Sequence, residues 1–391
     1  MKILLITHLK LTGSLRSYNF GKILARMGHE VTHISISNQS RFKIKTTIDN
    51  GMKIIETPDL LWGRARSGWD PWDVINRLFY LTSNQNGKID IVHGFECRPV
   101  TIYPILALKD KHKDIIFISD WNDWWGRGGL ISEKRPFWYK PIFGPLETYF
   151  EEAFRTKADG ISVITPALGE RAQALGVARE KWIWIPQGVD PTYFKFVPVH
   201  VARQQIGIPK NIKLAVFSGG DVIIDIDLVL LSMVKVCKAF PNAKLMLLGR
   251  KSSLTHKIAR QHGIEDKILE LGMIPFQDYP KYLACADVLL LPFKNKIANI
   301  GRWPTKLGEY MSVGRPVVSN PVSNIKGLFE TEKIGLLAAE SPDDFAAKII
   351  NLFENLKLCE EYGNNARRVA ERQFAWPVLT KKLENFYLKY I

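Results

Sequence analysis

Glu309 lies in a segment whose residue types could bind a nucleotide. Residues 303–320 read W-P-T-K-L-G-E-Y-M-S-V-G-R-P-V-V-S-N. We predict a short helix here, with Pro304 at the first helical position and Gly314 just past the end. Proline loses no hydrogen bond at a helix start, and glycine tolerates the backbone conformation that ends a helix.

The start of this helix has the chemistry of an anion site. Its unpaired N–H groups and the positive end of its dipole favour a phosphate. Thr305 and Lys306 add a hydroxyl and a cation in the first turn. One turn later, Glu309 could accept two hydrogen bonds from a vicinal diol such as a ribose. The segment is therefore a candidate for half of a nucleotide site, although an ordinary amphipathic helix would look similar.

Two glycine-containing loops follow predicted strands and could approach a phosphate or a sugar. Such loops let the backbone come close to a ligand, and a following helix adds N–H donors. A plain strand-to-helix turn also needs one glycine, so the first loop alone favours that simpler interpretation. The candidates are Gly13 with Ser14 in the first loop and Gly219 with Gly220 in the second.

Two further clusters have side chains that could bind a substrate with hydroxyl groups, such as a sugar. His93 and Glu96 lie near the end of a strand that begins near Asp90, and Asp123 lies in the loop D-W-N-D-W-W-G-R-G-G of residues 120–129. Carboxylates bind hydroxyl groups, and tryptophan rings stack on sugars. The alternatives are a histidine satisfied at a strand end and an aromatic loop that fills the core. We take His93, Glu96 and Asp123 as the catalytic candidates.

The elements that must position these residues form two similar halves. Residues 2–7 predict a buried strand, followed by a loop, a helix that ends at Gly28, and a strand from Glu30. This order requires a right-handed crossover and a parallel sheet. The same order restarts near Lys213. We predict an α/β fold of two Rossmann-like, doubly wound parallel-sheet domains, residues 1–190 and 191–373, with a C-terminal helix in residues 374–391.

Composition narrows the possible partners. The 391 residues carry a net charge of +15, spread along the chain without a run of consecutive bases. This favours anionic partners such as nucleotide sugars or an anionic membrane surface, and no nucleic-acid-binding signature is present. The four cysteines have no metal-ligand spacing. The short apolar run at the start is not a signal peptide, so we expect a cytoplasmic protein, with possible peripheral attachment to the inner membrane face.

Several motifs resemble one enzyme family in their order and spacing. They are G-H-E-V at 28–31, A-D-G-I-S-V-I-T at 158–165, I-P-Q-G-V-D at 185–190, A-D-V-L-L-L-P at 286–292 and the helix segment above. Taken together, these motifs make the chain resemble the retaining GT-B glycosyltransferases of group 1, which are similar to glycosyltransferase family 4.

This resemblance implies two domains that face one another across a cleft, with the final helix packed back on the first domain. It also implies transfer of a hexose from a UDP- or GDP-sugar to a glycan, a lipid-linked acceptor or a small glycosylated acceptor. Retention would follow from front-face attack, with the leaving phosphate taking the acceptor proton, so that no cofactor and no obligatory metal are expected. Phe276 lies where the family holds the base, although an ordinary loop aromatic would occupy the same place.

The sequence departs from the family at two points. Relatives often carry an arginine and a lysine after the second glycine loop, but residues 219–227 read G-G-D-V-I-I-D-I-D. Arg302, Lys306 and Arg250 are the alternative cations for a diphosphate leaving group. Relatives also often carry a glutamate where this chain has Gly301. Since glycine has no side chain, sugar hydroxyls would contact the backbone there. An epimerase or hydrolase of the same fold, and a non-catalytic relative, remain as alternatives; no G-x-G-x-x-G supports a dinucleotide enzyme.

Overall fold

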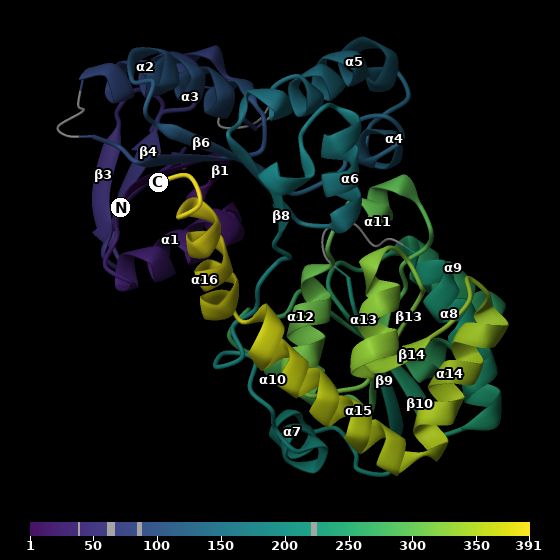
Figure 1. The fold of residues 1–391 in the computed structure, drawn as a ribbon. Coiled ribbons are helices and arrows are strands. Elements are labelled where there is room, and N and C mark those ends of the chain that lie inside the picture. The colour runs from purple at the N-terminus through teal and green to yellow at the C-terminus, as the bar shows by residue number, and fades with distance from the viewer. Residues whose placement is uncertain (38–39, 61–66, 84–87, 220–224) are drawn as a thin grey trace. The chain divides into compact units, whose positions relative to one another are not determined.

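The computed structural model describes residues 1–37, 40–60, 67–83, 88–219 and 225–391 and divides into two compact units (Figure 1). The first unit contains Met1–Gln187, Ile300–Trp303 and Trp376–Ile391. The second contains Gly188–Asn299 and Pro304–Ala375. Each unit is built around its own sheet.

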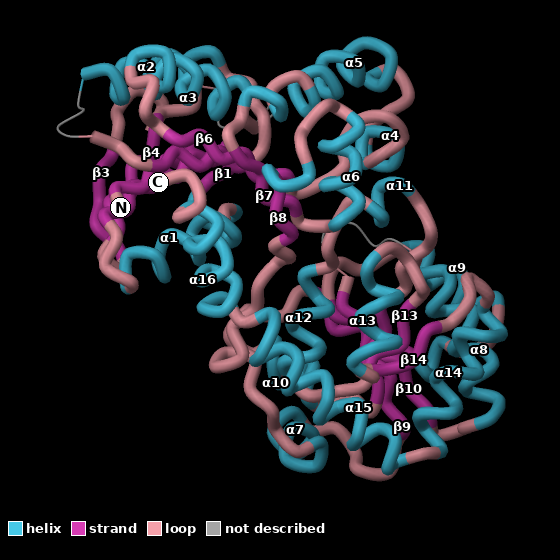
Figure 2. The backbone as a smooth tube through the Cα atoms, in the orientation of Figure 1, coloured by secondary structure: helices cyan, strands magenta, loops and turns pink. Residues whose placement is uncertain are grey.

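The first unit has an eight-stranded sheet, drawn in magenta in Figure 2, with the strand order β3-β4-β2-β1-β5-β6-β7-β8. All neighbouring strands except β3 and β4 are parallel, as predicted from the crossover pattern. The strands are β1 (Lys2–Lys10), β2 (Glu30–Ile36), β3 (Lys45–Asp49), β4 (Met52–Thr57), β5 (Ile91–Phe95), β6 (Ile116–Trp121), β7 (Gly160–Val163) and β8 (Trp182–Trp184).

Helices cover both faces of this sheet. The helices α1 and α16 pack together on one face, and α2 and α3 lie on the other (Figure 1). The helices of this unit are α1 (Leu15–Arg26), α2 (Pro71–Ser83), α3 (Pro99–Lys111), α4 (Leu130–Lys134), α5 (Tyr139–Glu152), α6 (Pro166–Ala174) and α16 (Trp376–Tyr387), with 3-10 turns at Leu11–Gly13, Arg155–Lys157 and Arg179–Lys181.

The edge strand β3 was not predicted. It pairs antiparallel with β4 through a turn at Asn50 and Gly51, which both have positive φ. Asn-Gly is the strongest short hairpin signal in a sequence, because both central residues of a type I′ turn need positive φ. The predicted parallel sheet therefore has one additional antiparallel strand at this edge.

The helix α16 completes the core of the first unit. Its residues Trp376, Leu383 and Phe386 are buried against Phe20 of α1 and against residues of the central strands. The rings of Phe20 and Trp376 meet edge to face with centroids 5.3 Å apart. Residues 376–387 thus pack with a unit whose other strands and helices all precede the second unit in the chain, apart from the short segment Ile300–Trp303.

A buried ion pair joins the elements of the first unit beneath the sheet edge. The Arg16 guanidinium donates to the Asp120 carboxylate from both Nε and one terminal nitrogen, at 2.9–3.1 Å. The same guanidinium donates to the carbonyl oxygens of Ile185 and Pro186 at 2.8 and 2.9 Å. One side chain of α1 therefore fixes the end of β6 and the segment that follows β8.

The second unit has a six-stranded sheet that is parallel throughout, in the order β11-β10-β9-β12-β13-β14. Helices α8 and α14 pack together against one face of it, around a core that includes Met233, Leu247 and Phe345. Its strands are β9 (Lys213–Ser218), β10 (Ala243–Leu248), β11 (Ile268–Gly272), β12 (Val288–Leu291), β13 (Val317–Ser319) and β14 (Gly335–Leu337).

The helices of the second unit connect these strands in alternation. They are α7 (Val199–Ile206), α8 (Ile226–Ala239), α9 (Ser253–Gln261), α10 (Tyr279–Ala284), α11 (Ile297–Ile300), α12 (Thr305–Ser312), α13 (Asn324–Glu332), α14 (Pro342–Glu354) and α15 (Leu356–Val369), followed by a π-helical turn at Ala370–Phe374; the last residue of α11, Ile300, falls in the first unit. Among the described helices, none combines the length and the apolar character needed to cross a bilayer.

The strand order locates the binding edge of each sheet. In the first unit the order reverses between β1 and β5, and in the second between β9 and β12. Open α/β sheets bind ligands at the carboxyl ends of their strands, at such a switch point. The loops that follow β1 and β5, and those that follow β9 and β12, are therefore where functional residues should lie.

The buried ion pair gives a test of the first unit. Asp120→Ala would leave the Arg16 guanidinium without its carboxylate, which should lower the free energy of unfolding by about 3–5 kcal/mol. Urea denaturation followed by circular dichroism would measure the loss. Glu30→Ala is the matched control, because the Glu30 side chain, which pairs with Lys2, is 69% exposed, and it should leave the unfolding midpoint nearly unchanged. Equal midpoints for both variants would contradict the role given to Arg16 and Asp120.

Candidate functional site

The helix α12 presents the candidate donor residues of the second unit. It begins at Thr305 and ends at Ser312, and Gly314 follows with φ of +68°, as predicted for its end. The start differs by one residue from the prediction, because Pro304 takes the extended N-cap conformation with ψ of 111°. Thr305 is therefore the first helical residue, and its N–H lies at the exposed start of the helix.

The carboxylate of Glu309 belongs to a small polar cluster. The hydroxyl of Tyr279, on α10, lies 3.0 Å from Glu309 Oε2 and 2.9 Å from Ser218 Oγ. Ser218 ends β9, and its N–H donates to the hydroxyl of Tyr310 at 3.0 Å. Burial raises the pKa of Glu309, while Lys306 and the Tyr279 hydroxyl oppose that rise. Tyr279 thus holds one oxygen of Glu309. The cluster lies next to Ser218, at the end of β9 beside the switch point.

Glycines bring the carboxyl ends of three neighbouring strands close together. Gly219 donates its N–H to Leu248 at 2.8 Å, and Gly249 donates to Gly272 at 2.8 Å. Gly249 has φ of +124°, and a Cβ there would lie 1.8 Å from the carbonyl oxygen of Gly219. Any side chain at Gly249 would therefore displace the loop after β9. Gly220, also a candidate, lies outside the described residues.

Cations reach this edge from elements other than the glycine loop. Lys306 acts electrostatically on Glu309, and Arg250 lines a small cavity beside Gly219. A lysine missed in the sequence, Lys294 after β12, bonds both oxygens of Asp227 at 2.9 and 3.1 Å. Lys294 thereby ties the loop after β12 to the start of α8. Its signal was its place just after a predicted strand at the switch point.

Gly301 and Arg302 group with the first unit and not with Lys306 and Glu309. A Cβ at Gly301 would lie 2.1 Å from Cβ of Trp124. Arg302 acts electrostatically on Asp123 and opposes the rise in pKa that burial causes there. The contacts described for both residues are therefore with the loop after β6, and their role in nucleotide-sugar binding stays a prediction.

Phe276 has a structural partner of its own. Its ring stacks on Tyr193 with centroids 4.8 Å apart and 10° between the planes. The Tyr193 hydroxyl donates to the Phe276 carbonyl oxygen at 2.8 Å. The ring therefore anchors the segment that follows Asp190, and its contact with the base of the donor stays a prediction.

The first glycine loop is open. Gly13 closes a 3-10 turn, and a Cβ built there would meet only Leu9, at 3.9 Å. The Ser14 hydroxyl donates to the carbonyl oxygen of Lys10 at 2.7 Å. Ser14 therefore uses its proton inside the turn, and the exposed space lies beside Gly13.

His93 does not have the position of a catalytic base. Its Nδ1 lies 2.6 Å from the Tyr387 hydroxyl and its Nε2 lies 3.1 Å from Ser162 Oγ. Ser162 donates to Asp120 at 2.5 Å, so the consistent arrangement has Nε2 donating to Ser162 and Nδ1 accepting from Tyr387. Burial lowers the pKa of His93 to about 4. Both ring nitrogens are engaged in the interior, so His93 is a structural residue.

Glu96 is a buried acid in a strained backbone position. It follows β5 with φ of +67°, which is uncommon for a residue with a side chain. Its Oε1 accepts the N–H of Asn122 at 2.8 Å, and its Oε2 lies 3.6 Å from Arg155. Burial raises the pKa of Glu96 to about 7, with Asp123 adding to the rise. Strain and a perturbed acid at a switch point are features of functional sites.

Asp123 is the acid of this edge that reaches the surface. It is partly exposed in the loop after β6. Burial raises its pKa to about 6, against the lowering effect of Lys134 and Arg302. Because Asp123 adds to the rise in the pKa of Glu96, the two carboxyl groups act electrostatically on one another. Together they form an acidic pair at the carboxyl edge of the first sheet.

The tryptophans of this loop support the acids and hold cations. Trp121 is fully buried. The Arg171 guanidinium lies 4.4 Å from the ring centre of Trp124, and that of Arg98 lies 5.0 Å from Trp125. The expectation that these rings stack on sugar is therefore weakened, since guanidinium groups already cover them. No group of three or more metal-ligating side chains gathers within the described ranges.

Residues missed in the sequence complete both clusters. Tyr279 gave no signal, because a tyrosine at the start of a short helix, 30 positions before Glu309, has no recognisable spacing to it. Glu151 was also missed, although it accepts from the N–H groups of Trp125 and Gly126 at 2.9 and 2.6 Å and fixes the loop that carries Asp123. Such contacts depend on tertiary packing and cannot be read from periodicity.

Two family models cover most of the chain. Glycosyltransferase Family 4 matches residues 16–193, and Glycosyl transferases group 1 matches residues 200–369. Their order agrees with the two Rossmann-like units of a GT-B fold. The chain belongs to the group 1 glycosyltransferases of GT-B fold.

Curated relatives support this family at low identity. The chain is 27% identical over 243 residues to WcaL of Escherichia coli K12, which is named as a colanic acid biosynthesis glycosyltransferase; the match covers 60% of this chain and 57% of WcaL. It is 26% identical over 196 residues to a D-inositol 3-phosphate glycosyltransferase of Corynebacterium aurimucosum, covering 48% and 45%. The chain thus matches about half the length of these relatives.

Solved structures share the fold over the whole chain. Sucrose-phosphate synthase from Thermosynechococcus elongatus aligns with a TM-score of 0.75 and 15% identity, covering 100% of this chain and 99% of that one. HepE of Anabaena, solved in complex with UDP, aligns with a TM-score of 0.72 and 14% identity, covering 100% of both chains. These likenesses establish the GT-B fold.

The raised pKa of Glu96 predicts a pH-dependent stability. Because the folded state binds this proton more tightly than the unfolded state, the stabilisation is complete below about pH 4.5 and is lost as the pH rises to about 7. Glu96→Gln should remove this pH dependence. Relative to the natural sequence, its free energy of unfolding should therefore be higher at pH 8 than at pH 4.5, by about 1–3 kcal/mol. Urea midpoints at both pH values test this. The exposed Glu180→Gln is the control, and parallel pH profiles for Glu96→Gln and the natural sequence would refute the assignment.

Proposed function

We propose that the protein is a retaining glycosyltransferase that moves a hexose from a UDP-sugar to a glycan or lipid-linked acceptor. The observation that carries the proposal is the cluster at the switch point of the second sheet, where Glu309 and Lys306 lie on one helix. The family membership supports transfer of a sugar. The choice of UDP is supported by the complexes of HepE with UDP and UDP-glucose. GDP is the alternative nucleotide.

In this proposal, one helix binds two parts of the donor. The exposed N–H groups at the start of α12, with Thr305 and Lys306, bind the diphosphate. Glu309, with one oxygen held by Tyr279, accepts from the ribose hydroxyls. Gly219 and Gly249 allow the backbone to approach the same ligand closely, and Arg250 supplements the cationic charge.

Charge on the leaving diphosphate is then met by protein donors. The sequence after β9 lacks the arginine and lysine common in the family, so part of their charge must come from other groups. Lys306, Arg250 and the helix start supply the remaining stabilisation, which is effective because the donors are fixed before reaction. We propose that no metal and no cofactor is obligatory, and activity should persist in EDTA.

The first unit supplies the acceptor groups. Asp123, partly exposed and with a pKa near 6, is suited to accept a hydrogen bond from a sugar hydroxyl. Glu96 beside it maintains the acidic character of the edge. Retention of configuration would follow from attack on the same face as the departing phosphate, with that phosphate taking the hydroxyl proton. A lipid-linked acceptor at an anionic membrane would also agree with the net charge of +15.

Incubation with a panel of nucleotide sugars tests the function directly. We expect slow hydrolytic release of UDP from a UDP-hexose and faster release when a glycan acceptor is added, with GDP-sugars much slower. Release is measured by a coupled nucleotide assay, and the anomeric product by NMR. Tight nucleotide binding without turnover of any donor would show a non-catalytic relative and refute the proposal.

Comparing UDP with uridine separates the roles of two residues. Glu309→Gln removes the charged acceptor of the ribose, so it should weaken both ligands by about 10- to 100-fold. Lys306→Met removes a phosphate contact, so it should weaken UDP by a similar factor and leave uridine unchanged. Calorimetric titration measures both affinities.

The exposed Glu330→Gln on α13 serves as the control for this comparison. It should bind both ligands like the natural sequence. Unchanged UDP affinity in Glu309→Gln would exclude the ribose role, and equal losses for UDP and uridine in Lys306→Met would exclude the phosphate role.

A further inference from the structure

The helix α5 of the first unit has its apolar side facing solvent. Trp138, just before it, and Ile142, Leu146 and Tyr149 within it follow one another at helical spacing along one stripe. They are 51%, 62%, 42% and 57% exposed. The adjoining Phe137 is 85% exposed. Soluble helices normally have the opposite arrangement.

The buried side of α5 explains why the helix cannot turn this stripe inward. Glu147 and Glu151 lie on that side and are buried. Glu151 is bonded by Arg171 at 3.0 Å and by the loop N–H groups described above. Glu147 lies 3.8 Å from Arg98. Rotation of the helix would expose these acids and break their contacts, so the apolar side is held outward.

Basic side chains border the stripe. Lys134 and Arg135 precede it, and Lys140 lies in its first turn, where it donates to the Ser132 carbonyl oxygen at 2.7 Å. Arg127 lies at the far side of the same region and pairs with Glu152 at 2.6 Å. Apolar and aromatic side chains edged by lysine and arginine are the composition of interfacial membrane helices.

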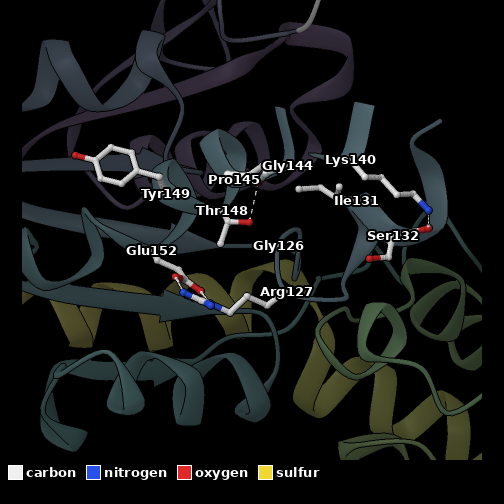
Figure 3. A pocket seen from close by; sticks show the side chains of 10 residues that line it. All are labelled: Gly126, Arg127, Ile131, Ser132, Lys140, Gly144, Pro145, Thr148, Tyr149 and Glu152. Atoms are coloured by element: carbon white, nitrogen blue, oxygen red, sulfur yellow. Dashed lines mark hydrogen bonds and ion pairs between the residues drawn. The ribbon is translucent and has the colours of Figure 1, made fainter. Parts of the chain in front are cut away.

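A groove opens beside this stripe. It has a volume of 540 Å³ and runs between the loop before α4 and the helix α5 (Figure 3). Tyr149 lines one part of it, and Lys140 and Ser132 line another (Figure 3). The exposed stripe therefore adjoins a concave surface and not a flat one.

We propose that the surface formed by Phe137, Trp138, Ile142, Leu146 and Tyr149, with Lys134, Arg135 and Lys140, docks on an anionic phospholipid bilayer. It rests on the proposed function in one respect, since membrane docking would serve a lipid-linked acceptor. The aromatic rings would enter the interfacial layer, where their amphipathic character is favoured. The bases would contact anionic headgroups.

Charge argues against a second copy of the chain as the occupant. A symmetric dimer through this surface would place the same patch on both sides. Lys134, Arg135 and Lys140 of each copy would then approach their own equivalents, between two molecules that each carry +15. Like charges at an interface disfavour association, whereas an anionic bilayer neutralises them.

Vesicle flotation tests the proposal without any nucleotide sugar. The full chain should float with vesicles of phosphatidylglycerol and phosphatidylcholine and much less with phosphatidylcholine alone. Phe137→Ser with Trp138→Ser should lower the vesicle partition coefficient by at least about tenfold, because two exposed aromatic rings are lost. Ile75→Ser with Phe79→Ser on α2 is the matched control, since these residues are 56% and 66% exposed in the same unit, and it should bind like the natural sequence.

Thermal melting of both variants shows that they fold. Equal vesicle binding by the two double variants, or no binding by the natural chain, would overturn the proposal. A dimer detected by light scattering and abolished by Phe137→Ser with Trp138→Ser, without vesicle binding, would replace the bilayer with a second copy. Absence of vesicle binding would not affect the release of UDP from UDP-sugars, and absence of UDP release would not affect vesicle binding. The two proposals can therefore be tested independently.

Discussion

The first unit depends on the buried pairing of Arg16 with Asp120. The carboxylate at the end of β6 would be too costly to bury alone, and the guanidinium of α1 compensates it while also bonding Ile185 and Pro186. Ser162 and His93 extend the same network to Tyr387 of α16. Because a buried polar network is stable only when every member is bonded, it sets the register between α1, α16 and the central strands, and with it the position of the loops that carry Glu96 and Asp123.

The two carboxyl edges differ in the charged groups that they present. At the first, Glu96 and Asp123 are acids whose burial raises their pKa, so the edge can hold or exchange protons near neutral pH. At the second, the buried acid Glu309 has Lys306 beside it, and in the proposed function Lys306 and the N–H groups at the start of α12 bind the charged diphosphate. Donor and acceptor chemistry would therefore be separated by unit, which agrees with family models that match the two parts of the chain separately.

Periodicity and punctuation were enough to predict most of the fold. The strands near Lys2 and Lys213, the end of the first helix at Gly28 and the glycine after α12 all follow local rules, and the structure confirms them. The β3–β4 hairpin was missed although Asn50-Gly51 signalled it. In the candidate site, glycines and the helix start could be read from the chain. The interior location of His93 and the bond from Tyr279 to Glu309 could not, because each depends on residues distant in sequence.

The position of α16 has a consequence for the order of folding. The second unit is nearly contiguous in sequence, whereas the first lacks Trp376, Phe386 and the Tyr387 hydroxyl until residues beyond 375 have been made. During synthesis, when domains usually fold from the N-terminus onward, the second unit can therefore close its core first. The strands of the first unit are synthesised earlier, but part of their apolar face stays uncovered until α16 has been made. Aggregation of the nascent chain is most favoured in this interval.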